Sequence, residues 1–177
     1  MAKKKKEEFQ EITQNAFHQA CNACMKRKEL NSCLKEIDQN AREVNLHEAI
    51  SETMVCYALG FKRNSGKAGD ATDKDGNLIE IKATSKHDGD LSSFSPDTKF
   101  NKLFFLRLDS EKDIAEIYDM KMDHVAFGKL RVNKAQTVSN QQNEGKRPRL
   151  SLITIIEHQG LKPCCKIDIV KKTVEKL

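Results

Sequence analysis

Hydrophobic positions follow a helical period in the first part of the chain. Residues 9–40 contain few β-branched residues, and their apolar side chains recur at the spacing of one helix face. The members of this face are Phe9, Ile12, Phe17, Ala20, Cys24, Leu30, Leu34 and Ile37. The pattern predicts one or two amphipathic helices.

Residues 46–59 predict a further helix. Asn45 is a candidate N-cap, because its side chain can accept a hydrogen bond from the first turn. Gly60 is a candidate C-terminal stop. The stretch that follows, residues 62–69 (KRNSGKAG), predicts a loop.

A period of two then replaces the helical one. Extended apolar or alternating runs at residues 78–84, 102–108 and 114–118 each predict a strand. The segment 121–149 predicts basic loops, and two runs at residues 150–156 and 165–170 favour late strands, or a strand and the edge of a helix. The order is helices first and then a sheet, which predicts an α/β (α+β) fold around one core.

The composition indicates an anionic partner. A chain of 177 residues fits one domain, and 31 basic against 26 acidic residues give a net charge of +5. This excess weakly favours nucleic acid as a partner, although many proteins of similar charge bind nothing. No run has the length of a membrane span, and the basic start lacks the apolar region of a secretory signal. We therefore expect a cytoplasmic protein with reduced thiols and no membrane partner.

The cysteines offer zinc as an alternative chemistry. Cys21 and Cys24 form a C-x-x-C, Cys33 and Cys56 follow, and four thiolates can hold Zn²⁺. The pair lies in a helical pattern rather than in a turn, and there is no second C-x-x-C, so we do not expect zinc. Burial as small hydrophobic side chains accounts for Cys164 and Cys165.

The stretch GDATDKDGNLIEIKAT, residues 69–84, gathers charged groups on one face of a predicted hairpin. Asp75-Gly76 is a strong signal for a turn between two extended runs. If the chain reverses there, Asp70 lies opposite Glu80, and Lys82 emerges on the same face as Glu80. The opposite face is apolar and consists of Ile79, Ile81 and Ala83.

Two carboxylates and a lysine in this arrangement suit phosphodiester hydrolysis. Paired carboxylates bind Mg²⁺, which lowers the pKa of a bound water and stabilises charge on a phosphate. An ammonium group adds positive charge or helps to deprotonate the water. Glu52, in the preceding helix, is a candidate extra ligand or orienting group. The alternative is a surface hairpin whose charges are solvated.

These residues resemble the PD-(D/E)xK nuclease motif, with the form Gly69-Asp70 followed by Glu80-Ile81-Lys82, and the hairpin is similar to that of PvuII-type restriction endonucleases. Gly69 stands where that motif usually has proline. The segments SETMVCYALGF, IEIKATS, DLSSFSP and NQQNEGKRPRLSL extend the resemblance to the small Bsp-type family of type II restriction enzymes, over residues 28–157.

The resemblance implies a restriction-endonuclease-like mixed β-sheet core and a Mg²⁺-dependent homodimer that cuts double-stranded DNA. It further implies a short G+C palindrome such as GC-N-GC, ends with 5′-phosphates, and a companion DNA methyltransferase in the same genome. Asp70 and Glu80 would be metal ligands, Lys82 the catalytic lysine and Glu52 a supporting catalytic residue.

The charge and hydrophobic pattern and this resemblance together divide the chain into parts. Residues 1–8 would be a flexible basic tail before a single nuclease domain at 9–177. Within it, residues 9–60 would serve dimerisation and support, 61–120 would form the catalytic hairpin and sheet, and 121–177 would hold the DNA-recognition segment and late strands.

Candidate DNA contacts concentrate in residues 121–149, where seven basic and two acidic side chains give a net +5, equal to that of the whole chain. Pro148 favours an extended Arg147, so Arg147 and Arg149 would project on the same side. Their guanidinium groups could read guanine bases, contact phosphates or pair with surface acids. Lys146, the neighbouring basic residue, is a further candidate DNA contact.

Other polar residues are weaker candidates for DNA contacts. Gln141 and Gln142 could read base edges or be solvated, and Ser93 could donate to a phosphate or belong to a turn before Pro96. His87 could act as a base, although an exposed loop histidine is the commoner case. Two other functions stay open: a repair or junction-resolving nuclease on the same core, and a catalytically inactive DNA-binding module.

Overall fold

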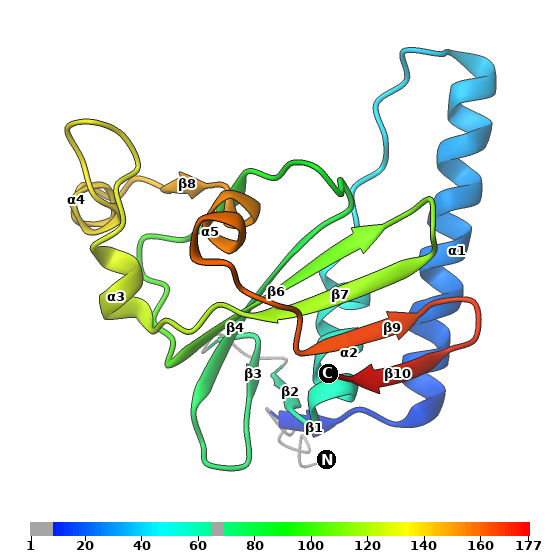
Figure 1. Ribbon diagram of the computed structural model, residues 1–177, viewed down its shortest axis with the longest axis horizontal. Helices are drawn as coiled ribbons and strands as arrows, with labels where there is room; N and C mark the ends of the chain where they lie inside the picture. Colours follow the sequence, from blue (N-terminus) through cyan, green and yellow to red (C-terminus); the bar gives the residue numbers. More distant parts are fainter. Residues whose placement is uncertain (1–8, 65–68) are drawn as a thin grey trace, which may run out of the picture.

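The computed structural model describes residues 9–64 and 69–177, and its elements are drawn in Figure 1. The helices are α1 (Gln14–Ile37), α2 (Glu48–Leu59), α3 (His124–Gly128), α4 (Val138–Asn143) and α5 (Leu152–Gln159). The longer strands are β4 (Leu78–Thr84), β6 (Lys102–Asp109), β7 (Ile114–Asp119), β9 (Cys165–Asp168) and β10 (Thr173–Lys176). The short strands are β1 (Phe9–Glu11), β2 (Lys62–Asn64), β3 (Ala71–Thr72), β5 (Ser92–Ser93) and β8 (Arg149–Leu150). The predicted tail at residues 1–8 lies outside the described residues.

A mixed sheet forms the centre of the fold. Across the described ranges its strand order is β1-β2-β3-β4-β6-β7-β9-β10, and β5 pairs with β8 in a separate two-stranded sheet. The central pair β4–β6 is parallel, whereas its neighbours β3–β4 and β6–β7 are antiparallel. The predicted fold class, an α/β (α+β) mixed sheet flanked by helices with a helical N-terminal segment, is confirmed.

The two faces of the sheet carry separate hydrophobic clusters, where one core was predicted. Along β6, Phe104 and Leu106 face the cluster that contains α1 and α2, while Leu103 and Phe105 face the cluster that contains α3, α4 and α5. This alternation follows from the period of two in a strand. Figure 1 shows α1 and α2 on one side and the three later helices on the other. The prediction of helices only before the sheet was therefore wrong.

The N-terminal helices match their predictions with shifted ends. Residues 9–11 form strand β1 instead of a helical turn, because they pair with β2. Thr13 then begins α1, its Oγ1 accepting the Ala16 N–H. For α2 the N-cap is His47 rather than Asn45, since His47 Nδ1 accepts the Ala49 N–H at 3.1 Å. Gly60 ends α2 in the left-handed conformation, as predicted.

Three segments differ from their predicted structure. Residues 62–64 of the predicted loop form strand β2, and residues 65–68 lie outside the described residues. The basic segment 121–149 contains α3 and α4 among its loops. Most of the run 150–156 is helical, because the Ser151 hydroxyl caps α5 and accepts the Thr154 N–H. The predicted strand at 165–170 is present as β9, and the final strand β10 was not predicted.

The cysteines of the zinc alternative do not converge. Cys21 and Cys24 of α1 and Cys56 of α2 are buried in the core, and Cys33 of α1 is exposed. Within the described ranges, no three His, Cys, Asp or Glu side chains are grouped as metal ligands. Cys165 is buried, as predicted, and Cys164 is partly exposed. No helix in the described part of the chain is long and apolar enough to cross a membrane.

Candidate active site

The hairpin of β3 and β4 brings Asp70 and Glu80 to facing positions, as predicted. Ala71 pairs with Ile79, and the backbone N–H of Asp70 donates to the Ile79 carbonyl at 2.9 Å. Asp70 Oδ2 also accepts the Ile81 N–H at 2.7 Å, which fixes the carboxyl group across the hairpin. The turn is held by Asp73, whose carboxylate accepts hydrogen bonds from the backbone of Asp75 and Asn77.

Gly69 has the left-handed backbone conformation that leads the chain into Asp70. Its φ is +68°, in the region that residues with a side chain rarely adopt, and a Cβ there would lie 3.3 Å from the Ile79 carbonyl oxygen. The backbone conformation at position 69 therefore favours glycine.

Lys82 is held between a carboxylate and an aromatic ring. Its Nζ lies 2.5 Å from Glu80 Oε1 and 5.1 Å from the centre of the Phe94 ring. Glu80 and Lys82 pair in register with Leu103 and Phe105 of β6, so they share the sheet face of the α3–α5 cluster. Only 7% of the Glu80 side chain and 24% of the Lys82 side chain are exposed.

Burial makes the ionised carboxylates of this pair costly. It raises the pKa of Asp70, against the hydrogen bond from Ile81 and the Lys82 charge. Burial and the charge of Asp70 together raise the pKa of Glu80, and Lys82 opposes this rise. Two carboxylates that repel each other, Glu80 buried and Asp70 half-buried, are a setting in which a bound cation would be favourable.

Glu52 lies beside this pair but has a partner of its own. Arg63 Nε donates to Glu52 Oε2 at 2.8 Å, and both residues line a cavity of about 390 Å³ together with Asp70. Burial raises the pKa of Glu52, as does the charge of Asp70, while Arg63 lowers it. The structure thus brings all four predicted catalytic residues into one region, and the catalytic role of each stays a prediction.

The donor set suits a hard cation. Carboxylate oxygens are the ligands that Mg²⁺ prefers, and Mg²⁺ keeps several waters in its shell. Asp70 and Glu80 are two such ligands, and since no third acidic residue joins them in a metal-binding group within the described residues, water or substrate oxygens would complete the coordination.

Comparison with known proteins identifies the chain. A family model described as Bsp6I restriction endonuclease matches residues 12–158. The chain belongs to this family. The type II restriction enzyme Bsp6I of Bacillus sp. (strain RFL6) is 40% identical over 172 residues, which cover 96% of this chain and 98% of that enzyme. The predicted class of protein, a type II restriction endonuclease, is thereby confirmed.

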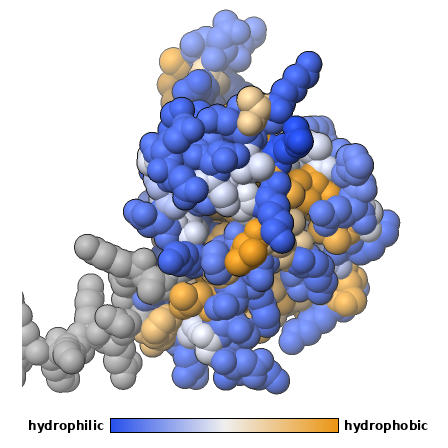
Figure 2. Space-filling view, turned by 90° about the vertical axis from the view of Figure 1, so that its left-hand side faces the viewer, coloured by the Kyte–Doolittle hydropathy of each residue, from blue (hydrophilic) through white to orange (hydrophobic). Residues whose placement is uncertain are grey.

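The predicted recognition arginines of this Bsp6I-family chain are free to meet a ligand. Arg147 and Arg149 are exposed on either side of the buried Pro148, and neither has an ion pair among the residues that the structure describes. The alternative of pairing with surface acids is therefore absent for the described part of the chain. Hydrophilic side chains cover most of the face that carries α3 and α4, as Figure 2 shows.

The other candidate DNA contacts already have protein partners. Lys146 Nζ pairs with Glu144 at 2.6 Å, but both side chains are exposed, and such a pair exchanges easily. Gln141 donates to the Gln136 side chain at 3.2 Å, and Gln142 to the Ser95 carbonyl at 3.0 Å. Ser93 is half-buried in β5, whose partner is β8, so the alternative of a simple turn at this position was wrong.

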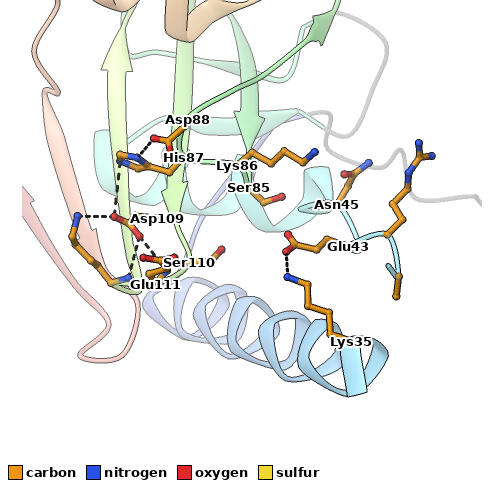
Figure 3. Close-up of a pocket in the computed structure, with 13 residues that line it drawn as sticks. Lys35, Glu43, Asn45, Ser85, Lys86, His87, Asp88, Asp109, Ser110 and Glu111 are labelled. Atoms are coloured by element: carbon orange, nitrogen blue, oxygen red, sulfur yellow. Dashed lines mark hydrogen bonds and ion pairs between the residues drawn. The ribbon is translucent and has the colours of Figure 1, made fainter. Parts of the chain in front are cut away.

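His87 belongs to a different cavity of the Bsp6I-family chain. Its Nδ1 contacts Asp88 Oδ1 at 2.9 Å, and its backbone carbonyl accepts a hydrogen bond from Arg107. The cavity, about 760 Å³, is drawn in Figure 3, and neither Asp70, Glu80 nor Lys82 lines it. The alternative in which His87 acts as a base, which was the less favoured one, therefore has no support from this cavity.

Sequence reasoning missed three residues that shape the site. Phe94 supports Lys82, Arg63 holds Glu52, and Asp90 binds the start of α5. The contacts of Phe94 and Asp90 join distant parts of the chain. For Arg63 a signal existed, because a basic residue close to the helix that carries Glu52 is a plausible ion-pair partner. It was missed because residues 62–69 were predicted to be a loop rather than a strand.

Proposed function

We propose that the chain is a Mg²⁺-dependent type II restriction endonuclease of the PD-(D/E)xK kind. It would hydrolyse double-stranded DNA at a short G+C palindrome such as GC-N-GC and leave 5′-phosphate ends. The observation that carries the proposal is the grouping of Asp70, Glu80 and Lys82 on one half-buried sheet face in a member of a restriction endonuclease family.

The proposed chemistry assigns each side chain a separate task. When bound, Mg²⁺ would supply positive charge to the phosphate and lower the pKa of an attacking water. The carboxylates of Asp70 and Glu80 would hold this ion. The Lys82 ammonium, kept near Glu80, would orient the water or offset the negative charge that develops on the phosphate. Glu52 and Arg63 would fix the edge of the site next to Asp70.

The proposed target sets a requirement for symmetry. A palindrome presents the same half-site twice, and a homodimer reads both halves with identical surfaces. We place the dimer contact within residues 9–59, where Leu30 and Ile37 leave 48% and 83% of their surfaces exposed. Arg147 and Arg149 of each subunit would read guanines. A companion methyltransferase would protect the host DNA.

Digestion of sequenced plasmid DNA with Mg²⁺, followed by mapping of the ends, tests the proposed function. We expect discrete fragments whose ends share one short G+C palindrome. Nicking that follows DNA structure without a fixed sequence would indicate a repair or junction-resolving nuclease. Plasmid that is bound but stays intact over a range of salt concentrations would indicate a catalytically inactive DNA-binding module.

Mg²⁺ is expected to raise the unfolding temperature at neutral pH. Because the fold raises the pKa values of Asp70 and Glu80, these groups favour folding in acid, and this contribution is lost as the pH rises. A cation that binds the ionised pair offsets that loss. Scanning calorimetry should show a rise of about 2–4 °C for each kcal/mol gained, and the rise should fade as the pH falls through the two raised pKa values.

Asp70→Asn provides the matched control for this measurement. The amide oxygen can still accept the Ile81 N–H, but the charge is gone. The variant should be more stable than the wild type in metal-free buffer and should not respond to Mg²⁺. An equal Mg²⁺ response in both proteins would contradict the proposed ligand.

A further inference from the structure

The ring that supports Lys82 belongs to Phe94, the residue directly after β5, and the partner strand of β5 is β8, which begins at Arg149. Phe94 is fully buried, and its ring centre lies 5.1 Å from the Lys82 ammonium, within the range of a cation–π contact. Lys82 is therefore bounded by Glu80 on one side and by Phe94 on another. A displacement of Phe94 would change the position of the ammonium.

The backbone around Phe94 is fastened to the segment of Arg147 and Arg149. Ser93 of β5 pairs with Arg149 of β8, and the Phe94 N–H donates to the Pro148 carbonyl at 3.1 Å. One residue further, the Ser95 carbonyl accepts the side-chain amide of Gln142 from α4. Figure 1 shows β8 between α4 and α5. The two-stranded ribbon of β5 and β8 therefore connects the segment of these helices to the backbone that carries Phe94.

Asp90 fixes the other end of the same ribbon. Its carboxylate accepts the backbone N–H groups of Leu152 and Ile153, each at 3.0 Å, and the hydroxyl groups of Ser92 and Ser151, each at 2.8 Å. Four hydrogen bonds to one charged group leave little freedom for the two strands to slide past each other. The ribbon therefore behaves as one unit.

We propose that Phe94 is a positioning residue that couples base reading by Arg147 and Arg149 to the placement of Lys82. Both arginines are exposed around the buried Pro148, whereas the buried ring of Phe94, the residue after β5, lies against the Lys82 ammonium. When the arginines bind the correct bases, the ribbon of β5 and β8 brings the Phe94 ring into position. The ring in turn holds the Lys82 ammonium in its catalytic position. This inference rests on the proposed function, because it takes the arginines as readers and Lys82 as the catalytic lysine.

Single-turnover cleavage by Phe94→Leu tests the coupling. The substrates are two duplexes, one carrying the site mapped by plasmid digestion and one with a single changed base pair, each with enzyme in saturating excess. We expect the rate on the mapped site to fall about tenfold, given the usual strength of a desolvated cation–π contact. The rate on the changed site should fall less, so the ratio of the two rates should shrink. Binding in Ca²⁺ should stay within about twofold, and Phe94→Tyr, which keeps the ring, should restore the rate.

Phe127→Leu is the matched control. Phe127 is as buried as Phe94, and the two ring centres lie 4.2 Å apart, but among the described residues the cation–π contact of Lys82 is with Phe94 and not with Phe127. It should lose similar stability while keeping the wild-type rate ratio. Should Phe94→Leu not fold, Phe94→Met fills more of the same space and replaces it in the comparison.

The outcomes distinguish a failure of the proposed role of Phe94 from a failure of the proposed endonuclease function. A cleaving wild type whose Phe94 and Phe127 variants behave alike would overturn the inference alone. The same holds if Phe94→Leu slows both duplexes by one factor, because the ring would then position Lys82 without any link to base reading. A wild type that does not cleave would overturn both.

Discussion

Asp70→Asn is expected to reduce cleavage of the mapped site by at least about 1,000-fold, which corresponds to about 4 kcal/mol of transition-state stabilisation. The substitution removes one of two carboxylates that would hold Mg²⁺, while the hydrogen bond from Ile81 can survive. The hairpin should therefore keep its shape. Single-turnover cleavage in Mg²⁺ measures the loss, and gel-shift binding in Ca²⁺ should show that the variant still forms the specific complex.

Asp75→Asn is the control for this effect. It makes the same chemical change in the same hairpin, but Asp75 is exposed at the turn, away from Lys82, and asparagine before glycine suits that turn. Its cleavage rate should stay close to that of the wild type. If Asp70→Asn cleaves as fast as Asp75→Asn, the metal-ligand role of Asp70 is refuted.

Arg149→Ala should weaken binding to the mapped site by at least about 30-fold. A guanidinium that bonds a guanine contributes about 1–3 kcal/mol, and a homodimer would lose two such contacts. Specificity should relax at one base pair in each half-site, because the loss applies only where guanine was read. Competition binding in Ca²⁺, with duplexes substituted one base pair at a time, measures both effects.

Lys146→Ala provides the contrast for Arg149. Its ammonium pairs with Glu144 at the surface, and a phosphate contact by such a group carries no sequence information. We expect weaker binding to all duplexes by a similar small factor, with a lower salt dependence. Uniform weakening by Arg149→Ala as well would show that this arginine contacts phosphate and not a base.

The candidate hairpin could be predicted because the features that define it are local. Asp75-Gly76 marks the turn, and alternation along residues 78–84 decides which side chains face the core. Together they fix the register that sets Asp70 opposite Glu80. The helix stop at Gly60 was predictable for the same reason, since one residue can satisfy the left-handed position.

The missed parts depend on contacts between distant residues. The parallel pairing of β4 with β6 cannot be predicted from the sequence of either strand alone, because neither pattern indicates its partner or direction. The start of α5 is fixed partly by Asp90, which lies 62 positions before Leu152. Strands such as β2 and β8 are too short for a period of two to appear, and they exist because a neighbouring strand supplies their hydrogen bonds. The contact of Phe94 with Lys82 was missed for the same reason, because it depends on how separate segments pack.

The left-handed backbone at Gly69 bears on how related enzymes are sought and altered. Proline locks φ near −65°, so it cannot take the place of a glycine at +68° without moving the residue that follows. Glycine at this position therefore cannot be exchanged for proline without a change in the backbone path to Asp70. A search that demands proline would pass over chains of this design, and an engineer who inserted it would alter the path that delivers Asp70.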